Sequence, residues 1–168
     1  MKLKNKFAVV TGASTGIGRA IAVALGKEGV FVALVARTKD RLEETKKLVE
    51  KAGGGMSKGA RIINISGTFE NGAKGWIPYY VSKRAIEDLT IGLSQEFERK
   101  NIFVNAISPS DCATDAYKKY FPQYIKDAID PNEIAKFVIH LCSVKADGIT
   151  GKVFVLKKNQ KPFEHFHY

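Results

Sequence analysis

Short apolar runs alternate with segments of helical periodicity in the first third of the chain. Residues 6–10 (KFAVV) and 30–36 (VFVALVA) have the length and composition of strands buried in a parallel sheet. Residues 16–29 lie between them and repeat apolar side chains at helical spacing, so one face of this helix packs on the sheet. A charged helix is predicted over 38–52. Strand, helix, strand and helix in this order predict a parallel α/β sheet.

The same alternation continues to the end of the chain. Further strands are predicted at 61–66, 101–108 and 151–157. A long helix is predicted over about 80–99 and another over 131–143, with a loop and a short helix after residue 108. The long helix is expected to bury a stripe formed by Ile86, Leu89, Leu93 and Phe97. The tail after residue 161 has no assignment. The predicted fold class is α/β, a Rossmann-like, doubly wound parallel sheet in a three-layer αβα arrangement.

Composition and charge narrow the class of protein. The chain has 168 residues, of which 45% are hydrophobic, and neither a repeat nor a linker interrupts it, so we expect a single domain over 1–168. No apolar run is long enough for a membrane span, and the N-terminus lacks a signal-peptide pattern, so a cytoplasmic location is expected. The net charge of +10 comes from scattered lysines without interleaved aromatics, and we expect no nucleic-acid partner.

A glycine-rich turn follows the first strand. Gly12, Gly16 and Gly18 are spaced G-x-x-x-G-x-G, and Ser14 and Thr15 add hydroxyl groups. Positions without side chains let the backbone approach a pyrophosphate at the positive end of a helix. The alternative is a tight strand–helix turn that binds nothing. Its position in the first strand–helix turn favours a dinucleotide.

The end of the second strand bears on the choice of cofactor. An acidic residue there would accept a hydrogen bond from a ribose 2′-hydroxyl, but this chain has Arg37 after the strand. A guanidinium pairs naturally with a 2′-phosphate, which predicts NADP(H). The alternative is a solvated arginine at the start of a helix.

Tyr79 and Lys83 lie four residues apart, on one face of the long helix. A neutral tyrosine can donate a proton to a forming alkoxide, and a nearby ammonium is expected to lower its pKa. This pair alone is common in helices.

Five segments together, TGASTGIG, RIINIS, YYVSK, VNAISPSDCATD and ITGKVFVL, resemble the short-chain dehydrogenase/reductase family, most closely its 3-oxoacyl and carbonyl reductases. The resemblance implies hydride transfer between NADPH and a small ketone or secondary alcohol. It implies that Tyr79 is the proton donor and that Lys83 holds the nicotinamide ribose. Tyr80 is the rival tyrosine, but Arg84 stands four residues after it. The resemblance also implies a dimer or tetramer formed through the tyrosine-bearing helix. The implied cofactor-binding residues are Gly12, Ser14, Thr15, Gly16, Ile17, Gly18, Arg37, Tyr79, Lys83 and Thr114.

The family's catalytic serine is harder to place. Counting back from Tyr79 gives Ser66, whereas counting along the strand gives Gly67. Ser66 is the candidate for polarising the substrate carbonyl, with Thr68 in reserve, and the alternative is that Ser66 only ends a strand. Cys112 is expected to pack rather than react. The His165-x-His167 pattern lacks further ligands, so no metal site is predicted.

The helix over 38–52 and the strand over 61–66 are joined too closely. At roughly 30 residues per strand–helix unit, about 60 residues of the family pattern are absent near 53–59. The sheet must then keep a gap or close by about one strand spacing of 4.8 Å. Three explanations stay open: residues absent from the sequence as given, a deletion variant that folds, or a remnant that binds a nucleotide or a partner without catalysis.

Overall fold

The computed structural model describes residues 3, 6–36, 38, 40–41, 44–45, 47, 61–69 and 73–165. The predicted alternation is present in it. The strands are β1 (Phe7–Thr11), β2 (Phe31–Val35), β3 (Arg61–Ile65), β4 (Phe103–Pro109), β5 (Val153–Leu156) and β6 (Phe163–Glu164). The α-helices are α1 (Gly16–Lys27), α3 (Ile77–Phe97), α4 (Asp115–Tyr120) and α5 (Pro131–Leu141). Short 3-10 helices cover Glu98–Lys100, Pro122–Asp127 and Val144–Ala146. The described residues of the predicted 38–52 helix, 40–41, 44–45 and 47, are helical.

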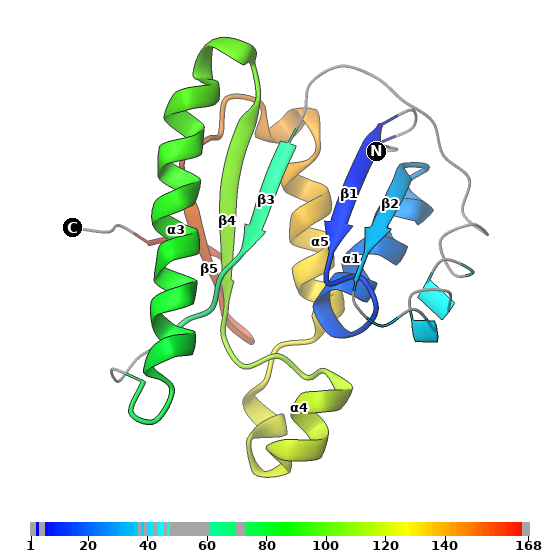
Figure 1. Cartoon of the computed structure of the whole chain (residues 1–168), viewed down its shortest axis with the longest axis vertical. Helices are drawn as coiled ribbons and strands as arrows, with labels where there is room; N and C mark the ends of the chain where they lie inside the picture. The colour runs from blue at the N-terminus through cyan, green and yellow to red at the C-terminus, as the bar shows by residue number, and fades with distance from the viewer. Residues whose placement is uncertain are drawn as a thin grey trace.

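The strands form two sheets, seen side by side in Figure 1. β1 pairs in parallel with β2, and the second sheet has the order β3-β4-β5-β6, with β3, β4 and β5 parallel. Among the described residues, β1 and β3 are not paired with each other, and no other strand lies between them in a shared sheet. Of the two arrangements that the short join allows, the structure has the gap rather than the closed sheet.

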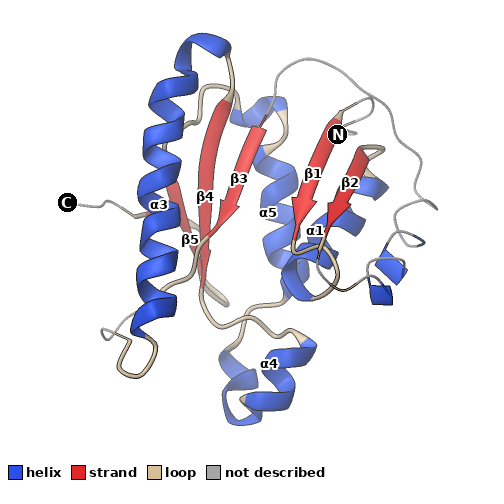
Figure 2. Ribbon diagram, viewed as in Figure 1, coloured by secondary structure: helices blue, strands red, loops and turns tan. Residues whose placement is uncertain are grey.

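Helices α1 and α5 pack against each other and hold the two sheets together (Figure 2). One apolar cluster contains Ile21 and Leu25 of α1, Ile134 and Val138 of α5, and Ile107 of β4. Ile63 and Ile65 of β3 pack against the same cluster. The two sheets therefore share one hydrophobic core through the packing of α1 on α5, although no described strand of one sheet pairs with a strand of the other.

Helix α3 covers the other face of the second sheet, and its packing contradicts the predicted apolar stripe. Its buried residues are Glu87, Thr90 and Ser94, whereas Leu89 is 54% exposed and Ile86, Leu93 and Phe97 are only partly buried. The prediction was wrong because β3 turns polar side chains toward this helix. The Asn64 side-chain amide donates to the Thr90 hydroxyl over 2.8 Å, and Ser66 lies against Glu87. Alternation along β3 places Ile63 and Ile65 on the opposite face.

The tail forms a strand that the sequence pattern did not predict. β6 runs antiparallel to β5, with Phe163 opposite Val155 and Glu164 opposite Phe154. The Glu164 carboxylate accepts from the Lys152 ammonium at 2.7 Å. Two residues are too few for a periodic pattern in the sequence. The strand is recognised from its pairing with β5 and from this ion pair.

Candidate active site

The glycine-rich turn after β1 requires all three of its glycines. Gly12 and Gly16 have φ values of +64° and +55°, a region that side chains disfavour. A Cβ atom on Gly18 would lie 2.3 Å from the Gly12 carbonyl oxygen, so this position has no room for any side chain. Thr15 caps α1 in an extended conformation, and Ser14 precedes it. The turn thus brings bare backbone to the N-terminus of a 12-residue helix, which suits an anionic phosphate.

Thr114 lies against this turn, although it is remote in sequence. A Cβ atom on Gly16 would be 3.1 Å from the Thr114 methyl carbon. The Thr114 hydroxyl also accepts from the Tyr117 backbone N–H at 3.2 Å and so caps α4. Thr114 and the glycine-rich turn, both predicted to bind the cofactor, are therefore adjacent in space.

Arg19 supports the turn, a role that the sequence reasoning missed. Its guanidinium donates to the Ser14 carbonyl at 2.7 Å and to the Thr45 hydroxyl at 3.0 Å, and it pairs with Glu44 at 3.0 Å. Thr45 is fully buried. An arginine directly after the last glycine of the turn was the available signal. Arg37, predicted to select NADP(H), lies outside the described residues.

Tyr79 and Lys83 lie on α3 beside the carboxyl end of β3. The Lys83 ammonium donates to the Ile65 carbonyl at 3.1 Å and lies 5.4 Å from the centre of the Tyr79 ring. The Tyr79 side chain is 49% exposed, so its hydroxyl remains accessible to a substrate. The end of β3 therefore holds the lysine next to the tyrosine.

Burial, rather than the ammonium, sets the direction of the tyrosine's acidity. Desolvation raises the pKa of Tyr79 above its ordinary value and lowers the pKa of Lys83. The expected net lowering of the Tyr79 pKa is not seen, because desolvation disfavours the charged phenolate and raises the pKa. Burial thus favours the neutral form of the Tyr79 phenol.

Ser66 and Gly67 face different neighbours. Ser66 is 3% exposed, and its hydroxyl oxygen lies 2.6 Å from a Glu87 carboxylate oxygen and 3.0 Å from the Lys83 carbonyl. A Cβ atom on Gly67 would lie 3.9 Å from the Tyr79 hydroxyl oxygen and 3.8 Å from Lys83 Cγ. The position beside the Tyr79 hydroxyl is therefore occupied by glycine, while the Ser66 hydroxyl contacts Lys83 and Glu87 of α3.

Aromatic rings surround Tyr79, which the sequence analysis did not anticipate. The Phe69 ring meets the Tyr79 ring edge-on at 5.7 Å and the Tyr80 ring at 5.1 Å. Trp76 lies 6.3 Å from Tyr79 and 6.1 Å from Phe121, centre to centre. The rings come from α3 and the residue before it, from the loop shortly after β3 and from the end of α4, so only the fold assembles them.

Both cysteines are poorly suited to act as nucleophiles. Desolvation, with a smaller contribution from Asp130, raises the pKa of the buried Cys112 to about 12. Burial raises the pKa of Cys142 to about 11 against the opposing effect of Arg61. In the described part of the chain, no group of three or more histidine, cysteine or acidic residues could hold a metal ion. None of the described helices is long and apolar enough to cross a membrane.

Comparison with known families identifies the chain in two segments. Residues 6–57 match the family model described as short chain dehydrogenase, and residues 52–158 match the model described as enoyl-(acyl carrier protein) reductase. The second match alone covers more than half of the chain. The chain belongs to the short-chain dehydrogenase/reductase family.

Similar proteins of this family are longer. The chain is 33% identical over 103 residues to the 3-oxoacyl-[acyl-carrier-protein] reductase FabG of Aquifex aeolicus, which covers 55% of this chain and 42% of that protein. It is 51% identical over 53 residues to general stress protein 39 of Bacillus subtilis. This match covers 31% of this chain and 18% of that protein. The chain thus spans less than half the length of these relatives. The two family matches meet at 52–57, which fits an internal deletion at the join.

Solved structures of short-chain dehydrogenases/reductases share the fold. An F189W actinorhodin polyketide ketoreductase with NADPH superimposes with a TM-score of 0.77 at 21% identity, covering 93% of this chain and 97% of that one. A protein from Agrobacterium tumefaciens, described as a 2-deoxy-d-gluconate 3-dehydrogenase with bound NADP, gives a TM-score of 0.79 at 21% identity, covering 92% and 96%. At these identities the likeness shows a reduced Rossmann-like α/β fold.

Proposed function

We propose that this short-chain dehydrogenase/reductase uses NADP(H) to interconvert a small ketone and a secondary alcohol, with Tyr79 as the acid and base. The observation that carries the proposal is the Lys83 ammonium bound to the Ile65 carbonyl beside the half-exposed Tyr79 phenol. This arrangement places a neutral acid and a fixed cation at the carboxyl end of a strand, where open α/β sheets bind ligands.

The glycine-rich turn fits the phosphates of the cofactor. Gly18 leaves its backbone bare, and the N-terminus of α1 favours negative charge there. Ser14, Thr15, Gly16, Ile17 and Thr114 would complete this contact. Two solved structures with a similar fold contain NADPH or NADP, which supports this choice of cofactor. Arg37 would bind the 2′-phosphate.

In the reductive direction, the chemistry that NADPH would supply at this site is a hydride for the carbonyl carbon. Tyr79 gives its phenolic proton to the carbonyl oxygen, which yields the alcohol and a phenolate that is reprotonated from solvent. Lys83 orients the tyrosine and stabilises that phenolate, and it would hold the nicotinamide ribose. A hydroxyl that polarises the carbonyl remains a prediction: Ser66 is bonded to Glu87, whereas Thr68 lines an adjoining cavity.

Replacing one hydroxyl tests the role of Tyr79. Tyr79→Phe should reduce NADPH-dependent ketone turnover by about a thousandfold or more, at the level expected of a general acid, while NADPH affinity changes little. Tyr80→Phe is the matched control and should keep most of the activity. Equal rates for Tyr79→Phe and the unaltered protein would refute the assignment.

A second candidate function is a catalytically impaired module that binds a nucleotide or a partner. The separation of β1 from β3 among the described strands supports it, as does a Val9 side chain that is 68% exposed. This candidate predicts NADPH binding without turnover of any ketone, and the Tyr79→Phe comparison then shows no difference.

The proposal also includes a cytoplasmic homo-oligomer built from single-domain protomers. Ile77, Val81 and Leu89 of α3 are all more than half exposed and recur at helical spacing, which supports pairing of this helix with a second copy. Light scattering measures the assembly, and one cooperative urea transition would support the single domain.

A further inference from the structure

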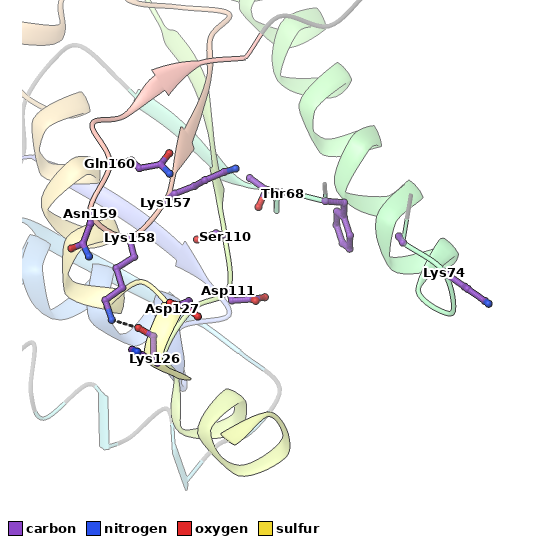
Figure 3. Close-up of a pocket in the computed structure, with 12 residues that line it drawn as sticks. Thr68, Lys74, Ser110, Asp111, Lys126, Asp127, Lys157, Lys158, Asn159 and Gln160 are labelled. Atoms are coloured by element: carbon purple, nitrogen blue, oxygen red, sulfur yellow. Dashed lines mark hydrogen bonds between the residues drawn. The ribbon is translucent and has the colours of Figure 1, made fainter. Parts of the chain in front are cut away.

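A cavity of about 870 Å³ opens beside the proposed acid, at the carboxyl ends of three parallel strands (Figure 3). Thr68 and Phe69 follow β3, Ser110 and Asp111 follow β4, and Lys157 follows β5. The Phe69 ring contacts Tyr79 edge-on, so the cavity wall touches the proposed acid. The lining contains none of the residues of the glycine-rich turn. The cavity is therefore distinct from the place proposed for the cofactor phosphates.

Its lining has an excess of positive charge. Four lysines line it against two aspartates, Asp111 and Asp127. Desolvation, followed by an interaction with Asp111, raises the pKa of Tyr117, so part of the Asp111 charge is already engaged. The remaining polar lining includes the Gln160 amide and the Ser110 hydroxyl. A purely apolar ligand would leave these groups poorly solvated.

Two of the lysines come from the end of β5 and approach the cavity differently. The Lys158 ammonium donates to the Lys126 backbone carbonyl and so bridges to the helical turn Pro122–Asp127. Lys157 is partly buried, and Figure 3 shows it extending toward Thr68. Lys74 also lines the cavity but comes from the opposite side, before α3. Lysines therefore line the cavity from the end of β5, from the turn Pro122–Asp127 and from the segment before α3.

We propose that the carbonyl substrate carries a carboxylate or phosphate group, which this cavity binds through Lys157 and Lys158 while the carbonyl lies at Tyr79. This inference rests on the proposed reductase function and names its substrate class. Lysine ammonium groups bind a carboxylate or a phosphate through charge-assisted hydrogen bonds. The cavity volume lies in the range that holds a ligand of drug size, so the two ends of one molecule can occupy both places.

Matched keto acids and esters test the charge requirement. The substrates are 4-oxopentanoate and 5-oxohexanoate, each compared with its neutral methyl ester under NADPH. We expect kcat/KM for the better acid to exceed that for its ester by about tenfold, and 0.5 M NaCl to reduce this preference by screening. Equal or better turnover of both esters would overturn the proposal.

Lysine variants test the location. Lys157→Gln and Lys158→Gln should each lower kcat/KM for the acid by about fivefold through KM, with little change for the ester. Lys145→Gln removes the same charge from an exposed lysine outside the cavity lining and should leave both substrates unaffected. An equal loss in Lys145→Gln would mean that net charge alone acts, which refutes the cavity as the site.

Binding without turnover separates this inference from the proposed function. Trp76 is the only tryptophan, and its backbone N–H bonds to Ala73, a residue of the cavity lining. If no ketone is reduced, a change of Trp76 fluorescence on titration with 5-oxohexanoate, weakened in Lys158→Gln, would support the anion site while the reductase proposal fails. The absence of both turnover and a fluorescence change would overturn the anion site as well.

Discussion

Gly67 is the position where one added hydroxyl should increase catalysis. A Cβ atom there would have as nearest neighbours Lys83 Cγ at 3.8 Å and Phe69 Cε2 and Tyr79 Oη at 3.9 Å each. These are ordinary van der Waals distances, so Gly67→Ser should fold without displacing its surroundings. A serine hydroxyl extends about 1.4 Å beyond Cβ and would come within hydrogen-bonding distance of the oxygen that Tyr79 protonates.

The expected gain follows from the loss seen when such donors are removed. One preorganised donor at a developing oxyanion contributes about a hundredfold or more in a closed site. Tyr79 is half exposed here, and water weakens the interaction, so we expect kcat to rise about tenfold, or about 1.4 kcal/mol of transition-state stabilisation. The assay is the initial rate of NADPH oxidation with a saturating ketone.

Gly67→Ala is the matched control because it adds the same Cβ atom without a hydroxyl. Its rate should equal that of the unaltered protein, and its free energy of unfolding should rise by about 0.4–1 kcal/mol because the unfolded chain loses freedom. Equal rates for the serine and alanine variants would refute the reasoning.

Three further predictions concern the turn, the acid and the thiols. Gly18→Ala places its Cβ 2.3 Å from a backbone carbonyl and should weaken NADPH binding at least tenfold in a fluorescence titration, whereas Gly92→Ala, which meets nothing within 4 Å, should not. Because burial raises the pKa of Tyr79, the proton donor stays protonated as pH rises, so reductive kcat should be flat from pH 6 to 9 and fall only above about pH 10; a fall centred below pH 9 would contradict this. With pKa values of about 12 and about 11, Cys112 and Cys142 should react with iodoacetamide at pH 8 at least tenfold more slowly than a free thiol, and rapid labelling of the folded protein would contradict their burial.

The elements and the phosphate turn could be read from the sequence because their signals are local. Apolar periodicity depends on neighbours within a few residues, and among the elements whose bounds the structure describes it located each long strand and helix to within a few positions. The glycine turn was recognisable because positive φ and close backbone contact leave no choice of residue at Gly12 and Gly18. The Tyr79–Lys83 pair was recognisable because four residues span about one helical turn.

Tertiary structure decided which side chains each face of a helix or strand contacts. The stripe on α3 failed because Asn64 and Ser66 of a distant strand make polar residues the buried ones. Local spacing could not decide whether Ser66 or Gly67 faces Tyr79, because successive residues point in different directions where a strand ends, and only the packed helix shows which side is occupied. The contact of Thr114 with the glycine turn, the aromatic rings around Tyr79 and the division into two sheets likewise depend on segments that meet only after folding. Sequence determines local conformation through short-range sterics and periodicity, whereas side-chain partners across the core are set by the packing of whole elements.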